Sequence, residues 1–244
     1  SDKQKLNNIG LEYDHVSIDI KDKINSLFTF SVFNDVSKDL MFLRMIKSDE
    51  EIKIIKHGAR IADLGGEEIL KNIKEGNTEL EIAITGRDIM EKEIAKSFPN
   101  AEYMDTWVWF QSGINTDGAH NPKTNRKLKK GDIYLVDSGG QYNFGTTDVT
   151  RTISLNNNNK RIKDIFTRVL QGHIAVASYK LKNNTFGSQI DSVARKPLRK
   201  INLDYAHGTG HGVGYFLNVH EGPHAISKSN KVNFREGMIV SNEP

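Results

Sequence analysis

The chain has 244 residues, of which 37% are hydrophobic and 27% are charged, and it contains no cysteine. This length is enough for one large domain, or for one domain and a fragment of a second. The lack of cysteine excludes a disulfide framework, a thiolate metal site and a cysteine nucleophile. The formal net charge of +3 is too small to indicate a nucleic-acid partner. No apolar run approaches the roughly 20 residues that cross a bilayer, so we expect no membrane partner and a cytoplasmic location.

In the first half of the chain, the clearest predicted elements are two helices. Residues 11–18 alternate weakly like a strand, and residues 20–28 have a short helical pattern. A helix is predicted to begin after Ser48, with Glu51 as its capping-box partner. A second one begins after Thr78 with Glu81 in the same role, and Pro99 ends it.

The middle of the chain is β-like, and the second half returns to helical spacing. Strands are predicted at 103–110, 132–137 and 146–155, the last two joined by a turn that starts at the Gly139–Gly140 pair; the asparagines at 156–159 form another turn. Helical spacing is found at 162–177 and from residue 188, where Pro197 limits or divides the helix. Residues 237–240 have the pattern of a last short strand. Helices flanking one central sheet make the predicted fold class α+β.

Asp137 and Asp148 lie in or beside strands whose neighbouring residues are apolar. A carboxylate at such a position is costly unless it is paired or bound to a cation. Taken alone, the two residues are better interpreted as an ordinary aspartate in a turn and another at the edge of a strand.

A cluster of histidines changes that interpretation. His207, His211, His220 and His224 fall within 18 residues, interleaved with glycines. Carboxylates together with imidazoles suit Mn, Co, Fe or Zn better than copper or an iron–sulfur cluster. Glu243 ends the last apolar run and is a third candidate carboxylate. Such a set could hold two cations roughly 3.5–4 Å apart with a bridging hydroxide as nucleophile, which is the arrangement of a hydrolase.

His120 follows a segment that contains both tryptophans of the chain, Trp107 and Trp109. Taken alone, this segment favours a packed strand followed by a loop. The functional alternative places His120 at the rim of a pocket as an acid/base group.

Residues 134–244 resemble the Xaa-Pro aminopeptidases of peptidase family M24, the creatinase–aminopeptidase P superfamily. The resemblance is carried by residues 137–142 (DSGGQY), 145–152 (GTTDVTRT) and 207–223 (HGTGHGVGYFLNVHEGP). It implies the pita-bread α+β fold and hydrolysis of the N-terminal Xaa-Pro bond by a metal-bridging hydroxide. The implied metal ligands are Asp137, Asp148, His211 and Glu243, and the implied substrate-binding and proton-handling residues are His120, His207 and His220.

Residues 9–133 resemble a different member of that superfamily, creatinase, which hydrolyses creatine without metal. Residues 41–48, 57–63 and 104–122 carry this second resemblance, and His120 matches both enzymes. Creatinases lack the acidic ligands that stand here at Asp137 and Asp148, so the sequence favours a metallopeptidase. Creatine amidinohydrolase remains the alternative, and an inactive binding subunit of the same fold is a third hypothesis.

The resemblance also predicts the domain organisation and the partners. Residues 1–40 are expected to be a remnant of an N-terminal domain plus a linker, and 41–244 a pita-bread domain that is incomplete at its C-terminal end. The second metal-bridging glutamate of the family would lie beyond Pro244, which leaves the second metal site open. Two divalent ions are expected, manganese first with zinc or cobalt as alternatives. The expected partners are a peptide with proline in second position and a second copy of the chain in a homodimer.

Overall fold

The structure, a computed structural model, describes residues 6–101, 104–118, 120–142, 145–156 and 159–244. The predicted strand start at residue 103 and residues 157–158 of the predicted turn lie outside these ranges. Within them, no helix is both long and apolar enough to span a membrane.

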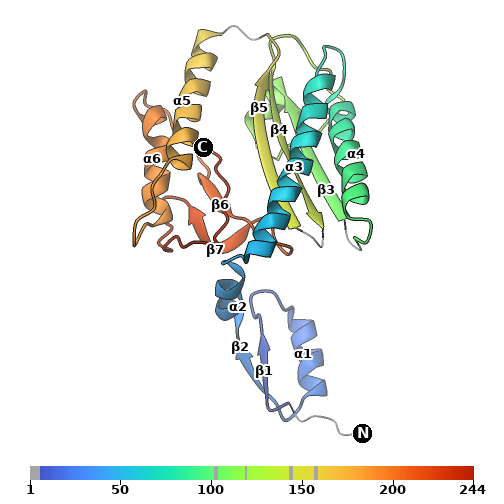
Figure 1. Ribbon diagram of the computed structural model, residues 1–244, viewed down its shortest axis with the longest axis vertical. Coiled ribbons are helices and arrows are strands. Elements are labelled where there is room, and N and C mark those ends of the chain that lie inside the picture. The colour runs from blue at the N-terminus through green and yellow to red at the C-terminus, as the bar shows by residue number, and fades with distance from the viewer. Residues whose placement is uncertain (1–5, 102–103, 119, 143–144, 157–158) are drawn as a thin grey trace.

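The N-terminal unit is a small β–α–β arrangement at one end of the molecule (Figure 1). Strand β1 (Asn8–Leu11) pairs in parallel with β2 (Val32–Asp35), and α1 (Ile18–Leu27) connects them. Helix α2 (Ser37–Arg44) then leads to the rest of the chain. The division of the chain at residue 40 stays a prediction.

The strand predicted at 11–18 is wrong, because β1 ends at Leu11 and a turn follows. In that turn, the amides of His15 and Val16 donate to the Glu12 carbonyl. Ser17 then caps α1 by accepting a hydrogen bond from the Ile20 amide. Polar residues that bond to the nearby backbone favour a turn and a helix start over a strand.

Both predicted capping boxes are confirmed. Helix α3 (Asp49–Asn72) begins after Ser48, and α4 (Glu79–Ser97) begins after Thr78; in each box the cap hydroxyl and the glutamate bond to the backbone reciprocally. The two helices pack against each other and against the sheet that follows.

Strands β3 (Met104–Ser112), β4 (Ile133–Tyr142) and β5 (Gly145–Ser154) form an antiparallel sheet in that order. Helices α3 and α4 cover one face of it (Figure 1). Because strand side chains alternate between faces, Val136 points into this core and Asp137 points to the opposite face. The core under the helices consists of Ile61, Ala62, Ile69, Ile82, Ala83, Met90, Ile94, Val108, Phe110, Leu128, Tyr134 and Val136.

The prediction that Gly139 and Gly140 start a turn is wrong, since β4 continues through them to Tyr142. A Cβ atom at Gly139 would lie 2.1 Å from the Thr147 carbonyl oxygen and 2.3 Å from the Trp107 ring. Glycine is therefore required here by the close approach of a neighbouring strand and of an indole ring, rather than by a turn.

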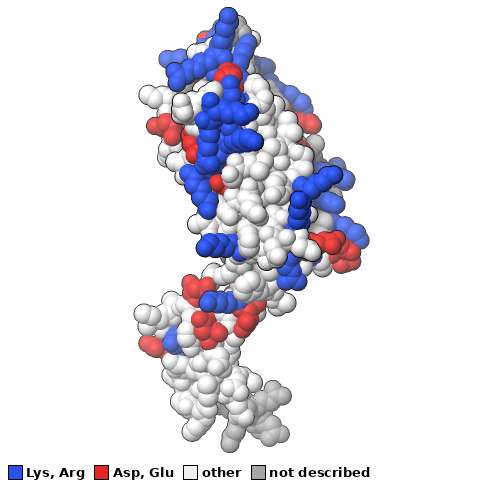
Figure 2. Space-filling view, turned by 90° about the vertical axis from the view of Figure 1, so that its left-hand side faces the viewer, with Lys and Arg blue, Asp and Glu red and all other residues white. Residues whose placement is uncertain are grey.

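The second half pairs α5 (Lys160–Ala177) with α6 (Gly187–Arg199), and α6 packs on β7 (Glu221–Ile226), which pairs with β6 (Gly210–Gly212). Pro197 lies near the end of α6 and does not divide it. On the face that this half presents in Figure 2, Lys and Arg side chains are more frequent than Asp and Glu, with large uncharged areas between them, although the net charge of the whole chain is only +3.

The last predicted strand, 237–240, is not formed as a regular strand. Gly237 has a positive φ of 86°. Among the residues described, the only β-bridge of this segment is an isolated one between Gly212 and Val240. Three backbone hydrogen bonds nevertheless hold residues 239–243 antiparallel to β6: Val213 to Ile239, Ser241 to His211 and Glu243 to Thr209.

Two adjacent glycines in α3 provide a test of this packing. Gly65 faces α4, where a Cβ would lie 2.7 Å from Met90 Cγ, whereas a Cβ at Gly66 meets nothing within 4 Å. We expect Gly65→Ala to destabilise the fold by roughly 1–3 kcal/mol through overpacking. Gly66→Ala should stabilise it by roughly 0.5–1 kcal/mol, because alanine restricts the unfolded chain. Urea unfolding of both variants measures the difference, and equal effects would contradict the close helix crossing.

Candidate active site

Asp137 and Asp148 come together on the open face of the sheet. Asp137 stands opposite Thr150 and Asp148 opposite Gly139, so the two aspartates are diagonal neighbours on adjacent strands. Their side chains are only 14% and 12% exposed. Burial, followed by the charge of Asp148, raises the pKa of Asp137 to about 6. The geometry thus forces two carboxylates into one poorly solvated place.

His211, at the centre of β6, brings the second half of the chain to these aspartates. Its Nε2 atom lies 3.1 Å from Asp148 Oδ2 and 3.2 Å from Glu243 Oε1. Burial opposes protonation of the imidazole, but the contacts with both carboxylates prevail and raise its pKa to about 10. Without a bound cation, His211 is therefore the positive charge between two carboxylates.

Glu243 is held by its backbone neighbours. Its amide donates to the Thr209 carbonyl at 2.8 Å. Asn242 donates to the His173 carbonyl of α5 at 3.0 Å, and the Asn242 carbonyl lies 3.1 Å from His173 Nδ1. Burial raises the pKa of the Glu243 carboxyl, but the contact with His211 and the Ser241 hydroxyl outweigh it and lower that pKa.

His120 lies at the exposed rim of the same site. Its Nε2 atom is 3.2 Å from Asp137 Oδ2, and its ring meets Trp109 edge-on at 5.9 Å between centroids. Trp109 is the residue directly opposite Asp137 in the neighbouring strand. The structure therefore places this histidine beside the predicted metal site, where it could act as an acid or base on a molecule bound there.

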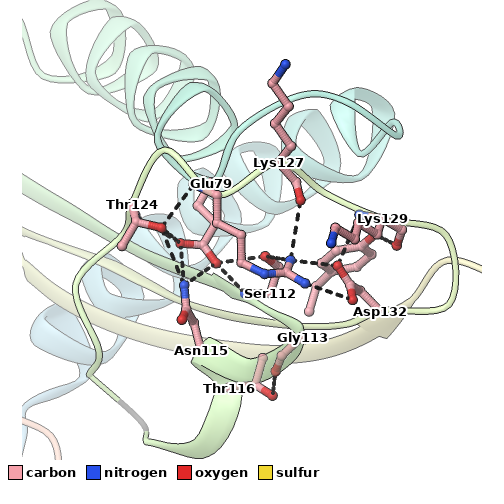
Figure 3. A network of polar contacts seen from close by, with 11 residues as sticks. Glu79, Ser112, Gly113, Asn115, Thr116, Thr124, Lys127, Lys129 and Asp132 are labelled. Carbon is pink, nitrogen blue, oxygen red and sulfur yellow. Dashed lines mark hydrogen bonds and ion pairs between the residues drawn. The ribbon is translucent and has the colours of Figure 1, made fainter.

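The segment that carries His120 is anchored by the buried carboxylate of Glu79, the first residue of α4 (Figure 3). Glu79 accepts hydrogen bonds from the amide and hydroxyl of Ser112 and from the amide and hydroxyl of Thr124. Asn115 Nδ2 donates to it as well, at 2.9 Å. Burial raises the pKa of Glu79, but these hydrogen bonds outweigh it and lower that pKa. One carboxylate thus fixes both ends of the loop.

The remaining predicted histidines differ in their positions. The His220 ring lies 4.3 Å from that of His211, and Asp148, His211 and His220 offer ligand atoms that all lie within 4.8 Å of one another. His207 is exposed and stacks on Tyr205 at 4.8 Å. His224 is buried and directs Nε2 to the Ile239 carbonyl, so it supports β7 and takes no part in the cluster.

The side chains in this cluster fit a divalent cation. Asp137 Oδ1 is buried and has no hydrogen-bond partner among the residues described, and Glu243 Oε1 is buried with only the charged contact to His211 Nε2 beside it in the same part of the chain. A buried oxygen without a partner is rare, and a bound cation would satisfy Asp137 Oδ1 and could replace the His211 proton beside Glu243. Oxygen and imidazole donors together are the set that manganese, cobalt and zinc accept.

Three residues next to the site were not found by sequence reasoning. Lys47 forms a buried ion pair with Glu221, the residue after His220. Glu79 and Arg195 are also buried and bond to segments that carry site histidines. The partners of Lys47 and Glu79 are far away in the sequence, so no spacing pattern marks those two residues; Asp191 and Arg195 have the i,i+4 spacing of an ordinary helix pair, which does not reveal the contact of Arg195 with the His207 carbonyl.

Comparison with known protein families identifies the chain. The model of metallopeptidase family M24 matches residues 53–244, and the chain belongs to this family. It is 35% identical over 239 residues to a creatinase of Bacillus sp. (strain B-0618), and the aligned region covers 97% of this chain and 58% of that protein. It is 38% identical over 220 residues to aminopeptidase P2 of Arabidopsis thaliana, covering 84% of this chain and 30% of the relative. Both resemblances recognised in the sequence are confirmed.

The solved structures confirm the pita-bread α+β fold. An X-Pro aminopeptidase from Thermotoga maritima MSB8 superposes with a TM-score of 0.84 at 29% identity, over 97% of this chain and 65% of that one. A prolidase from Pyrococcus horikoshii OT3 gives a TM-score of 0.83 at 27% identity, over 96% and 65%. The chain thus spans less than two thirds of the length of these relatives.

The Glu79 anchor predicts a pH dependence of stability. Because its pKa is lower in the folded state, its stabilisation is complete above the unfolded value of 4.5 and is lost as the pH falls through the lower folded value. Glu79→Gln should lower the free energy of unfolding by roughly 2–3 kcal/mol near neutral pH, and it should reduce the further loss of stability as the pH falls. Glu81→Gln, two residues along the same helix, keeps its capping box and should cost far less. Thermal unfolding between pH 3 and 7 compares the two variants with wild type. If Glu79→Gln loses stability at acid pH as steeply as wild type, Glu79 does not anchor the loop.

Proposed function

We propose that this chain forms the site of a metal-dependent aminopeptidase that hydrolyses the bond between an N-terminal residue and a following proline. The observation that carries the proposal is the convergence of Asp137, Asp148, His211 and Glu243 from both halves of the fold. Clustered, buried carboxylates favour a bound cation, and they also attract the ammonium group of a peptide N-terminus.

Asp137, Asp148, His211 and Glu243 would hold the metal. Bound divalent cations would polarise the scissile carbonyl and lower the pKa of a water molecule. We propose two ions, manganese first and zinc or cobalt as alternatives. An X-prolyl aminopeptidase from Caenorhabditis elegans supports the number, since it is described as an enzyme with a di-nuclear active site; its structure has a TM-score of 0.72 at 29% identity, over 88% of this chain and 36% of that one.

The exposed imidazoles at the rim would handle the substrate. His120 contacts Asp137 through Nε2, which orients its ring, and its other ring nitrogen could take up or release a proton. His207 and His220 approach Glu243 and His211, respectively, from the second half of the chain, and they would bind the peptide and transfer protons there. Trp109, beside His120, provides an apolar surface that a proline ring could contact.

The location and the assembly complete the proposal. The C. elegans relative is described as a cytosolic enzyme, and we extend that location, the cytoplasm, to this chain. The homodimer expected from the sequence stays a prediction.

A creatine amidinohydrolase is the second candidate, favoured by the identity with creatinase across 97% of this chain. An enzyme that works without metal would leave the carboxylates of Asp137, Asp148 and Glu243 balanced by the imidazoles of His211 and His120 alone, among the contacts described. Charge balance therefore ranks the metallopeptidase first. A binding subunit without activity is the third candidate.

We expect Mn²⁺-loaded protein to release the first residue of an Xaa-Pro-Pro peptide, and chelator to abolish the release. Asp148→Asn should lower kcat/KM by more than roughly 100-fold, since loss of a ligand exceeds the effect of losing an outer partner. Asp164→Asn, an exposed aspartate on α5, is the matched control and should behave as wild type. Chelator-resistant urea release from creatine would instead establish the second candidate, and peptide binding without cleavage the third.

The pKa of about 10 at His211 predicts proton release on metal binding. At pH 7 the metal-free imidazole is protonated, and a ligand must be neutral, so binding should release about one proton. Below the pKa of about 6 at Asp137, a second proton competes and affinity should fall more steeply. Calorimetry in PIPES and in Tris measures the protons released as a buffer-dependent enthalpy. His211→Gln should bind weakly without that dependence; wild type without it would contradict the assignment.

A further inference from the structure

Helix α6 contains an ion pair that the proposed mechanism does not use. The side chains of Asp191 and Arg195 are 2% and 1% exposed, and Arg195 Nε lies 2.8 Å from Asp191 Oδ2. Burying two charges is costly unless the remaining donors and acceptors are also satisfied. The partners of this pair therefore show what it is arranged to hold.

The guanidinium group of Arg195 donates hydrogen bonds to the segment that carries His207. Nη1 donates to the carboxylate of Asp204 at 2.8 Å and to the Tyr205 carbonyl at 2.7 Å. Nη2 donates to the His207 carbonyl at 2.6 Å. The guanidinium also lies 3.9 Å from the centre of the Tyr205 ring, which in turn stacks on the His207 imidazole. Arg195 thus contacts both the backbone of His207 and the Tyr205 ring on which the His207 imidazole stacks.

Asp191 extends the same network toward Glu243. Its Oδ1 atom accepts a hydrogen bond from the Thr209 hydroxyl at 2.7 Å, and that hydroxyl lies 2.5 Å from the Tyr205 hydroxyl. The Thr209 carbonyl accepts from the Glu243 amide. A single buried ion pair therefore connects to a predicted substrate histidine and to a predicted metal ligand.

The segment held in this way has no regular structure of its own. Residues 203–208 belong to neither a helix nor a strand, so they lack the ladder that fixes His211 in β6. Backbone hydrogen bonds hold Leu203 and Thr209 on either side of His207, and Arg195 supplies the donors for the Tyr205 and His207 carbonyls in between. An apolar pair of the same volume could fill the space but would leave the Tyr205 and His207 carbonyls without these donors.

We propose that Arg195 and Asp191 are positioning residues: the pair holds His207 for substrate binding and, through Thr209, holds the segment that places Glu243 at the metal. This inference rests on the proposed function for the roles of His207 and Glu243, but the network itself does not depend on which reaction is catalysed.

The first experiment compares Arg195→Lys with Arg199→Lys. Lysine at 195 can keep the charge beside Asp191 but cannot reach the Tyr205 and His207 carbonyls together. Arg199, one turn further along α6, bonds to the same Asp204 and does not contact His207, so it is the matched control. Arg195→Lys should raise KM for the Xaa-Pro-Pro peptide roughly 10–100-fold, while Arg199→Lys remains near wild type.

The second experiment compares Thr209→Val with Thr209→Ser, and it keeps the proposal testable should Arg195→Lys fail to fold. Valine removes the hydroxyl that joins Thr209 to Asp191, whereas serine keeps it. Thr209→Val should weaken Mn²⁺ binding roughly 10-fold in calorimetry, and Thr209→Ser should restore most of the affinity.

The readouts separate this proposal from the proposed function. The side-chain NMR signal of His207 in metal-free protein, identified by its loss in His207→Gln, should shift in Arg195→Lys and not in Arg199→Lys. That signal and the Mn²⁺ affinity are measurable even if no peptide is cleaved. If the variants lower the melting temperature but leave the His207 signal, the Mn²⁺ affinity and KM unchanged, the pair is only structural and the proposal is overturned.

Discussion

Repulsion among the carboxylates of Asp137, Asp148 and Glu243 is the constraint on which the rest of this structure depends. Burial, followed by the charge of Asp148 and then more weakly that of Glu243, raises the pKa of Asp137, so holding these carboxylates together is unfavourable without a cation. His211 offsets part of it by lying between two of the carboxylates. A chain that holds these groups together must be rigid around them, because any loosening would let the charges separate.

That rigidity comes from buried charged residues outside the cluster. Glu79 accepts hydrogen bonds from both ends of the loop that carries His120, and Arg195 donates to the segment that carries His207. Lys47 pairs with Glu221 next to His220. The two irregular segments with His120 and His207 are thus each held by one buried charge with several partners, and charge-assisted hydrogen bonds are stronger and more directional than apolar contacts.

The sequence predicts local features of this molecule well and long-range contacts poorly. The capping boxes at Ser48 and Thr78 were predictable because all their atoms lie within one helical turn. The candidate metal ligands were raised by residue type and clustering, and their assignment as one set came from the resemblance to a family. Gly139 was misplaced because its neighbours Trp107 and Thr147 belong to other strands, and Glu79 was missed because its partner Thr124 is 45 residues away.

Gly139 also has a consequence for how the site can vary. It lies opposite Asp148 and two residues after Asp137, and the Thr147 carbonyl occupies the space that any side chain there would need. A larger residue would push β4 and β5 apart at the point where they hold the two aspartates. The separation of the two carboxylates, and with it the size of any cation that would fit between them, is therefore controlled by a residue that has no side chain.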